Sequence, residues 1–594
     1  MSKVEQLITE HIDIWTSAIL AKSTAGRGSN KKYELYGIKK LRELILELAV
    51  RGKLVPQDPN DESASVLLER IAAEKAELMK EGKIKKSKPV PEIVDEEKPF
   101  DIPSNWDWTQ LCAIAEINPR NNVDDNADVS FVPMTLVSTS YKGEHESEIK
   151  PWGEIKKGYT HFADGDIAIA KITPCFENSK AAIFSNLKNG VGAGTTELHV
   201  ARPIGNNIEQ KFVLLYLKSP RFLAVGEFKM TGSAGQKRVP KSYFEGNPLP
   251  IPPLLEQQRI VTKVDELMLL CDQLEQQTEA SIDANATLVE VLLATLTDSA
   301  DANELAQNWA RVSEHFATLF TTEQSIEALK QTLLQLAVMG KLVPQDPNDE
   351  PAAVLLEKIA AEKAQLIKDK KIKKEKPLPP IGDDEKPFEL PHGWEWCRLD
   401  ALSLSSEAGW SPQCEPAPRE GENWGVVKIS AVTWGKYQPD ENKTLPASLE
   451  PRPQYEVKAG DFLISRANTA ELVARAVVVP PSPPVKLMMS DKIIRFVFSE
   501  NIFSEYINLA NNSSYSRQYY AAVAGGTSSS MKNVSRNQVR ALAIALPPYS
   551  EQHRIVAKLN ELMNMCEQLK TNLQQSQETQ VQLTDALIDQ ALVQ

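Results

Sequence analysis

PLLEQQRIVTKVDELMLLCDQLEQ, at residues 253–276, decides the fold, because it reappears at residues 548–571 as PYSEQHRIVAKLNELMNMCEQLKT. In both copies the apolar residues recur at alternating steps of four and three, which is the heptad pattern of a coiled-coil seam. The predicted seam consists of Ile260, Val264, Leu267, Cys271 and Leu274 in the first copy and Ile555, Leu559, Leu562, Cys566 and Leu569 in the second. Because one such helix needs a partner to bury its stripe, we expect the two copies to pack antiparallel as a rod with twofold pseudo-symmetry.

A second segment is also repeated. LAVRGKLVPQDPNDE at residues 48–62 returns as LAVMGKLVPQDPNDE at residues 336–350. Residues 41–111 align with residues 329–399 without a gap, and about 46 of the 71 positions are identical. The repeat is far longer than those of solenoids or propellers, so the sequence predicts two large related halves.

The composition indicates an ordinary globular protein of several domains. The chain has 594 residues, of which 42% are hydrophobic and 25% charged, and this excludes disorder of the whole chain. Neither an uncharged apolar run of about 18 residues nor a basic segment followed by an apolar one is present, so we predict no membrane span and no secretory signal. Six cysteines without a C-x-x-C pair signal neither a disulfide framework nor a zinc finger, and favour a reducing cytoplasm.

The net charge of −13 argues at first against a nucleic-acid partner. However, residues 101–255 and 391–548 each contain nearly equal numbers of basic and acidic side chains. The acidic excess therefore lies in the segments predicted to be helical, and the middle segments remain candidates for nucleic-acid binding.

The two middles hardly resemble each other, although the repeated segments that surround them are nearly identical. We call the repeated segments the frame and the middles (about 112–248 and 400–546) the inserts. Recent duplication followed by neutral drift would spread the differences evenly, and alone it does not account for this contrast. Short β-rich runs alternate with Gly, Pro and Asn in the inserts, which indicates small α/β domains with several strands.

The predicted fold class is therefore α/β (α+β): two small mixed α/β domains separated by long antiparallel coiled-coil helices, with an internal pseudo-twofold repeat and extra helical segments. The predicted divisions are an N-terminal helical region and linker (1–100), a first small α/β domain (101–252), a central helical region (253–390), a second small α/β domain (391–547) and a C-terminal coiled-coil helix (548–594).

A basic skeleton survives in both inserts. GDIAIAK at residues 165–171 matches GDFLISR at residues 460–466, a turn and a strand that end in a basic residue. Arg, Lys and Asn supply the donors that contact phosphates and base edges of duplex DNA. The candidate DNA-binding residues are Lys171, Thr173, Asn178, Lys180, Lys237 and Arg238 in the first insert and Arg466, Asn468, Arg475 and Lys532 in the second. The alternative is ordinary strand-end charge that faces solvent.

Lysines also follow the first Ala- and Glu-rich helix of the frame, at Lys83, Lys85, Lys86 and Lys88. Contact with phosphate is one interpretation, and a solvated, semi-rigid connector is the favoured one.

Motifs for catalysis are missing. Gly190, Gly192 and Gly194 lack a Walker lysine, and the string Leu546–Tyr549 has Leu where an amino-methyltransferase carries Asn or Asp before Pro-Pro-Tyr. Asp166 and Asp461 alone do not make a nuclease site. No His pattern predicts a metal site, so we expect no catalytic residues and no metal in this chain.

Together these residues resemble the specificity subunits of type I restriction and modification systems, often called HsdS. The resemblance covers nearly the whole chain and rests on the duplicated layout, the inserts that begin near PSNWDW and PHGWEW, the two strands of the basic skeleton, and the exits PLPIPPLLEQQRIV and ALPPYSEQHRIV. It implies a non-catalytic subunit whose two recognition domains each read one half of a bipartite DNA sequence.

The resemblance also implies partners in a bacterial cytoplasm. Two methyltransferase subunits would carry S-adenosylmethionine and methylate adenine, and two restriction and translocation subunits would use ATP and Mg²⁺, with no cofactor on this chain. Two alternatives stay open: a coiled-coil scaffold without DNA readout, and a stand-alone enzyme with both methyltransferase and specificity functions, which would need the motifs that are missing here.

Overall fold

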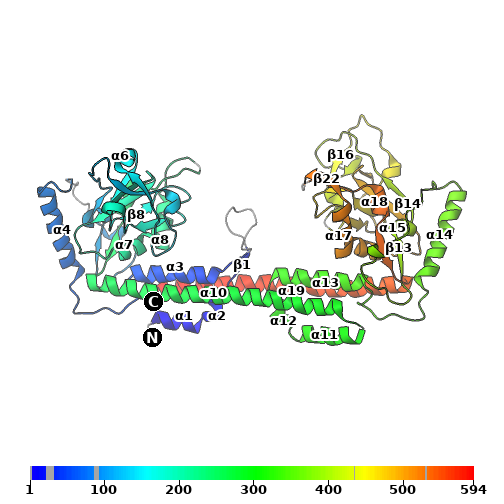
Figure 1. The fold of residues 1–594 in the computed structure, drawn as a ribbon, viewed down its shortest axis with the longest axis horizontal. Helices are drawn as coiled ribbons and strands as arrows, with labels where there is room; N and C mark the ends of the chain where they lie inside the picture. Colours follow the sequence, from blue (N-terminus) through cyan, green and yellow to red (C-terminus); the bar gives the residue numbers. More distant parts are fainter. Residues whose placement is uncertain are drawn as a thin grey trace. The chain divides into compact units, whose positions relative to one another are not determined.

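The structure is a computed structural model, and it describes residues 3–21, 33–85, 92–233, 235–300, 302–433, 435–528 and 531–593. The chain divides into two compact units. Unit 1 contains Met1–Ser281 and Gln575–Gln594, and unit 2 contains Ile282–Gln574. Each unit therefore combines one insert with the frame around it and with the end of the other half's long helix (Figure 1).

The chain outside the two inserts, which contains the frame, is helical, as its Ala-, Leu-, Glu- and Lys-rich sequence predicts. Its helices are α1 Lys3–Glu10, α2 Ile12–Ser17, α3 Tyr36–Val50, α4 Ala64–Lys80 and α10 Leu254–Asp298, followed by α11 Ala302–Glu314, α12 Phe316–Leu319, α13 Glu323–Val338, α14 Ala352–Lys368 and α19 Tyr549–Val593. A short pair of strands, β1 Leu20–Ala21 and β2 Tyr33–Glu34, precedes α3. Among the described residues, α10 is the one helix long and apolar enough to cross a membrane, a test that buried core helices also pass.

In unit 1, α3 packs against both long helices. Arg42 of α3 forms ion pairs with Asp272 and Glu275 of α10. The Tyr36 hydroxyl donates to Asp585 of α19 at 2.8 Å. Just beyond α3, the Lys53 ammonium donates at 2.8 Å to the carbonyl of Leu592, near the end of α19. The first half of α10 and the end of α19 thus share α3 as a neighbour.

Unit 2 repeats this arrangement with α13 in the place of α3. Lys330, which aligns with Arg42, forms an ion pair with Glu567 of α19. Lys341, which aligns with Lys53, donates to the carbonyls of Thr297 and Ser299 at the end of α10. The pseudo-twofold repeat of the sequence is therefore also a repeat of contacts.

The predicted seam residues are buried in the core of each unit, except Leu569, which is half-buried. In unit 2 they share one hydrophobic cluster with α13 and with the end of α10. That cluster includes Ile555, Leu559, Leu562 and Cys566 of α19, Ile326, Leu329 and Leu333 of α13, and Val289, Leu293 and Leu296 of α10. The seam of α19 thus packs against a short frame helix as well as against the other long helix.

The first insert contains two four-stranded sheets and one strand pair. Their orders are β6-β5-β10-β7, β4-β11-β8-β9 and β12-β3. The strands are β3 Asp107–Thr109, β4 Ala115–Ile117, β5 Asp128–Val132, β6 Glu148–Pro151, β7 Thr160–Ala163, β8 Ile167–Ala170, β9 Ala181–Ile183, β10 Val191–Gly194, β11 Leu198–Pro203 and β12 Leu249–Ile251. The helices are α5 Leu111–Ile114, α6 Trp152–Ile155, α7 Gln210–Leu217, α8 Pro220–Phe228 and α9 Lys241–Gly246.

The second insert has the corresponding sheets in the orders β16-β15-β20, β14-β21-β17-β19 and β13-β24, with an additional sheet β18-β23-β22. The strands are β13 Glu395–Arg398, β14 Ser403–Ala408, β15 Gly425–Val427, β16 Asn442–Thr444, β17 Phe462–Ser465, β18 Ala467–Asn468, β19 Ala476–Val478, β20 Leu487–Met489, β21 Ile493–Phe498, β22 Gly525–Ser528, β23 Met531–Asn533 and β24 Ala543–Leu546. The helices are α15 Leu399–Leu402, α16 Ser504–Asn512, α17 Ser514–Val523 and α18 Arg536–Arg540. Short 3₁₀ turns lie at Asp95–Glu97, Met134–Leu136 and Lys188–Gly190 in the first half and at Asp383–Glu385, Ile429–Val432 and Pro453–Tyr455 in the second.

The two inserts share the arrangement of their central strands despite their different sequences, although the second has one strand fewer in its first sheet and an additional sheet. Leu198 of β11 pairs with Ala170 of β8, and Ile493 of β21 pairs with Ser465 of β17, so the register is the same in both. Within the first two sheets of each insert the pairing is antiparallel, except that β10 runs parallel to β5 and β20 parallel to β15. Two mixed α/β domains joined to long helices confirm the predicted fold class.

Candidate nucleic-acid interface

In each insert, a basic residue directly follows an inner strand of the second sheet, at equivalent positions. All four residues of β8 and of β17 are buried, and Lys171 and Arg466 follow them directly. The backbone N–H of Lys171 donates to the Glu197 carbonyl at 2.9 Å, and that of Arg466 donates to the Lys492 carbonyl at 2.8 Å. The buried strand and the matching hydrogen bond therefore place the two basic residues equivalently.

In each insert, a second basic segment, distant in sequence, lies beside the residues that follow this strand. In the first insert the Thr173 N–H donates to the Lys237 carbonyl at 3.0 Å, and the Lys171 carbonyl accepts from Val239 at 2.8 Å. In the second insert Asn468 pairs with Lys532 across β18 and β23. The structure thus brings Lys171, Thr173, Lys237 and Arg238 together in unit 1, and Arg466, Asn468 and Lys532 together in unit 2.

Three of these basic side chains have free donors. Within the part of the chain that the structure describes, the side chains of Lys171, Lys237 and Arg466 make no hydrogen bond or ion pair. Lys237 is exposed, and Lys171 and Arg466 are half-buried. A cation without an internal partner retains its full hydrogen-bonding capacity for phosphates or base edges.

Other candidate side chains form bonds inside their own domain. The Lys180 ammonium donates to the Met134 carbonyl at 2.8 Å, and the Lys532 ammonium donates to the Gly526 carbonyl at 2.8 Å. The Thr173 hydroxyl donates to the Lys237 carbonyl at 3.2 Å. These three side chains help to shape the loops that carry the free cations.

Arg238 is held by a carboxylate. Its Nε and Nη2 donate to the two oxygens of Glu197 at 2.9 and 2.8 Å, and this pairing lowers the pKa of Glu197. This ion pair holds the segment that contains Lys237 and Arg238 against the turn before β11. The backbone of Lys237 is therefore held in place, while its side chain stays free.

The remaining candidates lie at the edges of this region. The Asn468 amide donates to the Thr433 hydroxyl at 3.2 Å, and its oxygen accepts from the Thr469 N–H. Arg475 is half-buried, and burial lowers its pKa. Asn178 is exposed on the turn between β8 and β9, where its N–H donates to the Pro174 carbonyl.

Arg120, a basic residue that no sequence pattern singled out, lies beside Lys171. Arg120 and Lys171 line a common hollow of about 270 Å³, together with Tyr159, His161 and Thr196. Arg120 is exposed, and its Nη1 donates to the Tyr159 carbonyl at 3.3 Å. A single Arg in a Pro- and Asn-rich turn has no pattern that distinguishes it from ordinary surface charge.

The two aspartates considered for nuclease chemistry form structural ion pairs. Asp166 is buried and accepts two hydrogen bonds from Arg202, at 2.8 and 2.7 Å. Asp461 forms an ion pair with Arg495 at 2.9 Å. Within the described residues there is no group of His, Cys, Asp and Glu side chains that could hold a metal ion.

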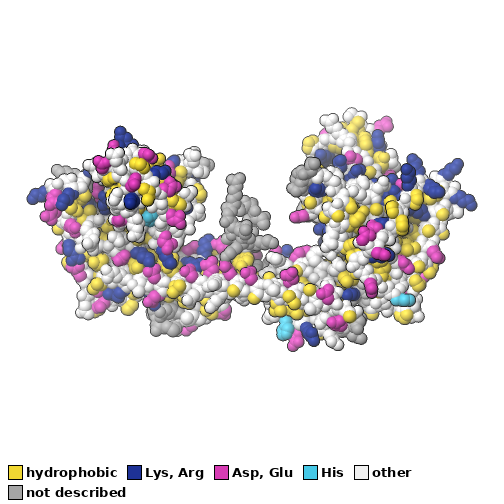
Figure 2. Space-filling view, in the orientation of Figure 1, with side chains coloured by type: hydrophobic (Ala, Val, Ile, Leu, Met, Phe, Trp, Pro, Cys, Tyr) yellow, Lys and Arg dark blue, Asp and Glu magenta, His cyan; other side chains and the backbone are white. Residues whose placement is uncertain are grey.

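The linker lysines are only partly described. Lys83 is exposed and forms an ion pair with Glu81, and Lys85 is exposed, whereas Lys86 and Lys88 lie outside the described residues. Basic side chains gather over the end of α14 in the second half (Figure 2).

Comparisons with known proteins identify the family. Residues 103–284 match the family described as type I restriction modification DNA specificity domain. The chain is 60% identical to the type I restriction enzyme EcoEI specificity subunit and 54% identical to the EcoAI specificity subunit, both from Escherichia coli. Each alignment covers 99% of this chain and 100% of the relative. The chain belongs to the specificity subunits of type I restriction enzymes. It is therefore the non-catalytic subunit, as the missing motifs predicted.

A solved structure of this family is also similar to the specificity subunit described here. The HsdS subunit from Thermoanaerobacter tengcongensis is 17% identical, with a TM-score of 0.42, and the alignment covers 83% of this chain and 98% of that one.

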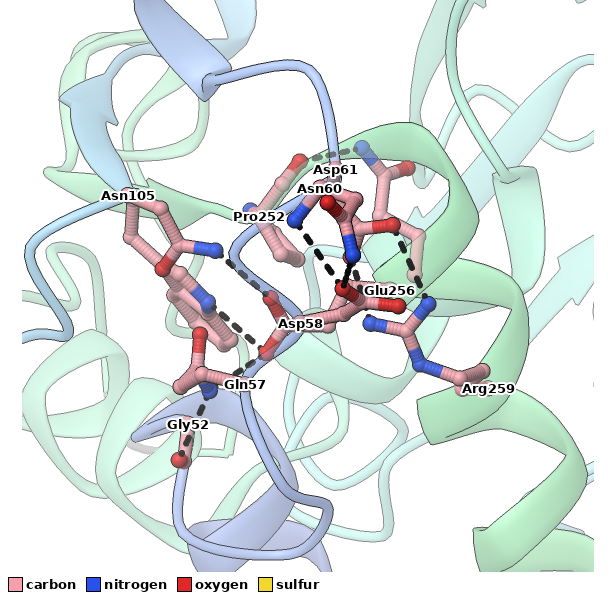
Figure 3. A network of polar contacts seen from close by, with 11 residues as sticks. Gly52, Gln57, Asp58, Asn60, Asp61, Asn105, Pro252, Glu256 and Arg259 are labelled. Atoms are coloured by element: carbon pink, nitrogen blue, oxygen red, sulfur yellow. Dashed lines mark hydrogen bonds and ion pairs between the residues drawn. The ribbon is translucent and has the colours of Figure 1, made fainter.

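In this specificity subunit each recognition domain is fastened to the frame by a buried polar network, which we call the joint. In unit 1 the joint is centred on Glu256, whose carboxylate accepts from the Trp106 indole at 2.9 Å and from the Gln57 amide at 2.7 Å (Figure 3). Asn105 contributes a longer contact of 3.4 Å, and Arg259 forms an ion pair with Asp61 beside them. Burial raises the pKa of Glu256, although the donors around it oppose this effect.

The joint of unit 2 is the same network in the repeated residues. Glu551 accepts from the Trp394 indole at 3.0 Å and from Gln345 at 3.1 Å, and Arg554 forms an ion pair with Asp349. All of these residues lie in the repeated segments, so the two halves build the joint from the same side chains.

Proposed function

We propose that each recognition domain of this specificity subunit reads one half of a bipartite DNA target and directs adenine methylation and restriction by partner subunits. The observation that carries the proposal is the equivalent placement of free basic side chains, Lys171 with Lys237 in one domain and Arg466 in the other. Base readout requires donors placed in a groove, and sequence specificity requires that the two domains present different donors from the same scaffold.

Lysine and arginine offer different chemistry at the equivalent position. Arg466 presents a planar guanidinium that can donate two parallel hydrogen bonds to guanine, whereas Lys171 presents a compact ammonium. The two domains would therefore read different bases, and two readers on one side of the duplex would read blocks about one helical turn, or 34 Å, apart.

The partners follow from the family and stay part of the proposal. Two methyltransferase subunits would bind S-adenosylmethionine, and two restriction and translocation subunits would bind ATP and Mg²⁺ in the bacterial cytoplasm, while this chain binds no cofactor. Because each recognition domain carries almost balanced charge, partners that surround the DNA would supply much of the salt-dependent affinity.

Selection from a randomised duplex pool by this chain, purified with its methyltransferase subunit and followed by sequencing, tests the function. We expect two short specified blocks separated by a fixed gap. A single block would contradict the bipartite reader, and the absence of any enrichment would favour a scaffold that does not read DNA.

A further inference from the structure

Unit 1 contains an aromatic-walled hollow beneath α8. Its volume is about 440 Å³, and its lining includes Phe100, Trp108, Tyr216, Arg221 and Tyr243. The hollow lies at the edge of the strand pair β3–β12, with Trp108 and Pro250 in its lining. None of the candidate DNA-binding residues lines it.

The frame builds the same walls in unit 2. Val50, Phe100 and Trp108 align with Val338, Phe388 and Trp396, and both sets line the corresponding place. The Phe–Trp ring pair is also the same, with centroids 5.2 Å apart in unit 1 and 5.1 Å apart in unit 2. Only about 10 Å³ remains open in unit 2, so its hollow is filled.

Tyr515 is the filler in unit 2. Its ring meets Trp396 edge-on with centroids 6.0 Å apart, and its hydroxyl donates to the Glu385 carbonyl at 2.8 Å. The tyrosine thus packs its ring against the aromatic wall and donates a hydrogen bond to a carbonyl at the rim. Both contacts are typical of an aromatic side chain with a polar end.

Arg221 occupies the position of Tyr515 in unit 1. Ser219 caps α8 by accepting from the Phe222 N–H, and Ser513 caps α17 by accepting from the Ser516 N–H. Arg221 and Tyr515 both stand two residues after the cap. Arg221 is exposed, so unit 1 has the walls of the hollow without the side chain that fills them.

The polar group at the rim is also free in unit 1. Glu97 aligns with Glu385, and within the described residues no hydrogen bond reaches the Glu97 carbonyl. Arg221 has no side-chain hydrogen bond or ion pair within the same part of the chain. Lys229, also at the rim, lies over the Tyr243 ring at 5.3 Å.

Apolar surface continues from the hollow across α8. A second hollow of about 370 Å³ shares Arg221 and Val225 with the first and is lined by Leu44, Ala224, Ile588 and Leu592. Phe228 stands one turn beyond Ala224 on α8, and 90% of it is exposed. An exposed aromatic side chain next to an aromatic hollow that the chain's own side chains leave open indicates an interaction surface rather than a solvent-facing wall.

We propose that the unit 1 hollow is a docking site for a tyrosine side chain of a partner polypeptide, with an acidic neighbour that meets Arg221 and Lys229. We choose tyrosine as the occupant because the second half of the chain fills the corresponding hollow with its own tyrosine, Tyr515. The choice of the methyltransferase subunit as the partner rests on the proposed function. Since only one of the two hollows is open, two identical partner subunits would be held with different strengths.

The variant Arg221→Tyr tests the site by placing in unit 1 the residue that fills unit 2. Arg221→Met is the matched control, because it removes the charge without supplying a ring. p-Cresol, which has the side chain of tyrosine, is the first probe, with binding followed by ligand-observed NMR. We expect p-cresol to bind the wild type and Arg221→Met and to lose binding to Arg221→Tyr, while all three unfold cooperatively. Equal p-cresol signals for wild type and Arg221→Tyr would overturn the site.

Titration with the methyltransferase subunit, followed by native mass spectrometry, tests the occupant. We expect Arg221→Tyr to weaken binding of one partner copy by about tenfold or more and to leave the other copy unchanged. Equal binding of both copies by wild type and Arg221→Tyr would overturn the docking proposal alone. A wild type that binds no methyltransferase subunit would instead contradict the proposed function. The p-cresol experiment would then still show whether the hollow binds the side chain of tyrosine.

Discussion

Trp106 donates its indole N–H to Glu256 at 2.9 Å, although 150 positions separate the two residues in the chain. Trp394 and Glu551 repeat this bond at 3.0 Å across 157 positions. In each half the bond joins the start of the recognition domain to the first turn of the long helix that follows it. In each half, one buried carboxylate therefore links the recognition domain to the helix that follows it.

Replacing Glu256 by Ala is expected to lower the free energy of unfolding of unit 1 by about 3 kcal/mol, because it leaves the buried donors of Trp106 and Gln57 without an acceptor. Glu551→Ala should have a similar effect on unit 2. Urea denaturation followed by tryptophan fluorescence measures both. Glu266→Ala, at an exposed position of α10, should change the stability by less than about 0.5 kcal/mol, and an equal loss in this control would contradict the role of the joint.

Acid should destabilise unit 1 through His199. Burial lowers the pKa of His199 to about 4, and its ring bonds to the Val239 carbonyl and stacks on Phe244. The unfolded chain binds a proton near pH 6.5 while the folded chain does not, so stability is lost as the pH falls from about 6.5 to 4. The loss at this site is about 3 kcal/mol.

His199→Gln retains a donor and removes the titration, so its unfolding free energy should depend less steeply on pH between 4 and 6.5 than that of the wild type. Denaturant titrations at several pH values give the two slopes. Identical slopes would show that His199 is not the acid-sensitive group. The second insert has Ile494 at the equivalent position, so we expect this contribution only in unit 1.

Lys341 should stabilise the end of α10. Its ammonium donates to the carbonyls of Thr297 and Ser299 at 2.7 and 2.9 Å, where the helix leaves carbonyl groups without partners. Lys341→Met should therefore cost about 1 kcal/mol and speed hydrogen exchange in residues 290–300. Lys358→Met removes an exposed ion pair to Glu350 and serves as the control, for which exchange at the helix end should not change.

The two recognition domains should fail independently. Arg466→Ala is expected to relax one block of the selected DNA motif, at a cost of about 1–3 kcal/mol for the affected base. The double variant Lys171→Ala with Lys237→Ala should relax the other block. The exposed Lys188 follows β9 on a different part of the first insert, and Lys188→Ala should leave both blocks intact. A change in both blocks from either variant would contradict the assignment of one domain to one block.

Sequence periodicity predicted the long helices and the buried stripe, because a heptad pattern reports which residues avoid water. It did not predict that α3 and α13 pack against the same helices. A stripe shows that a face is buried and does not show which helix covers it. The ion pairs of Arg42 with Asp272 and of Lys330 with Glu567 show that α3 covers α10 and that α13 covers α19. Each pair joins residues that are far apart in the sequence, so it is visible only in the folded chain.

For the candidate interface, the positions of the basic residues were also predictable, whereas their contacts were not. The matched strands GDIAIAK and GDFLISR indicated where a basic residue leaves each domain, and the structure places Lys171 and Arg466 equivalently. The internal bonds of Lys180 and Arg238 were not predictable, since their acceptors lie 46 and 41 positions away. Their identities as basic residues are visible in the sequence, but their partners are not.

Beside the joint, one contact between each recognition domain and its long helix uses a main-chain atom of the domain. Gln257 accepts from the backbone N–H of Glu209 at 2.9 Å, and Gln552 accepts from that of Phe503 at 3.0 Å. A backbone N–H is present whatever side chain occupies the position, apart from proline. This contact would therefore persist in a domain with an entirely new set of DNA-reading residues, which favours the origin of new target sequences by exchange of a whole domain.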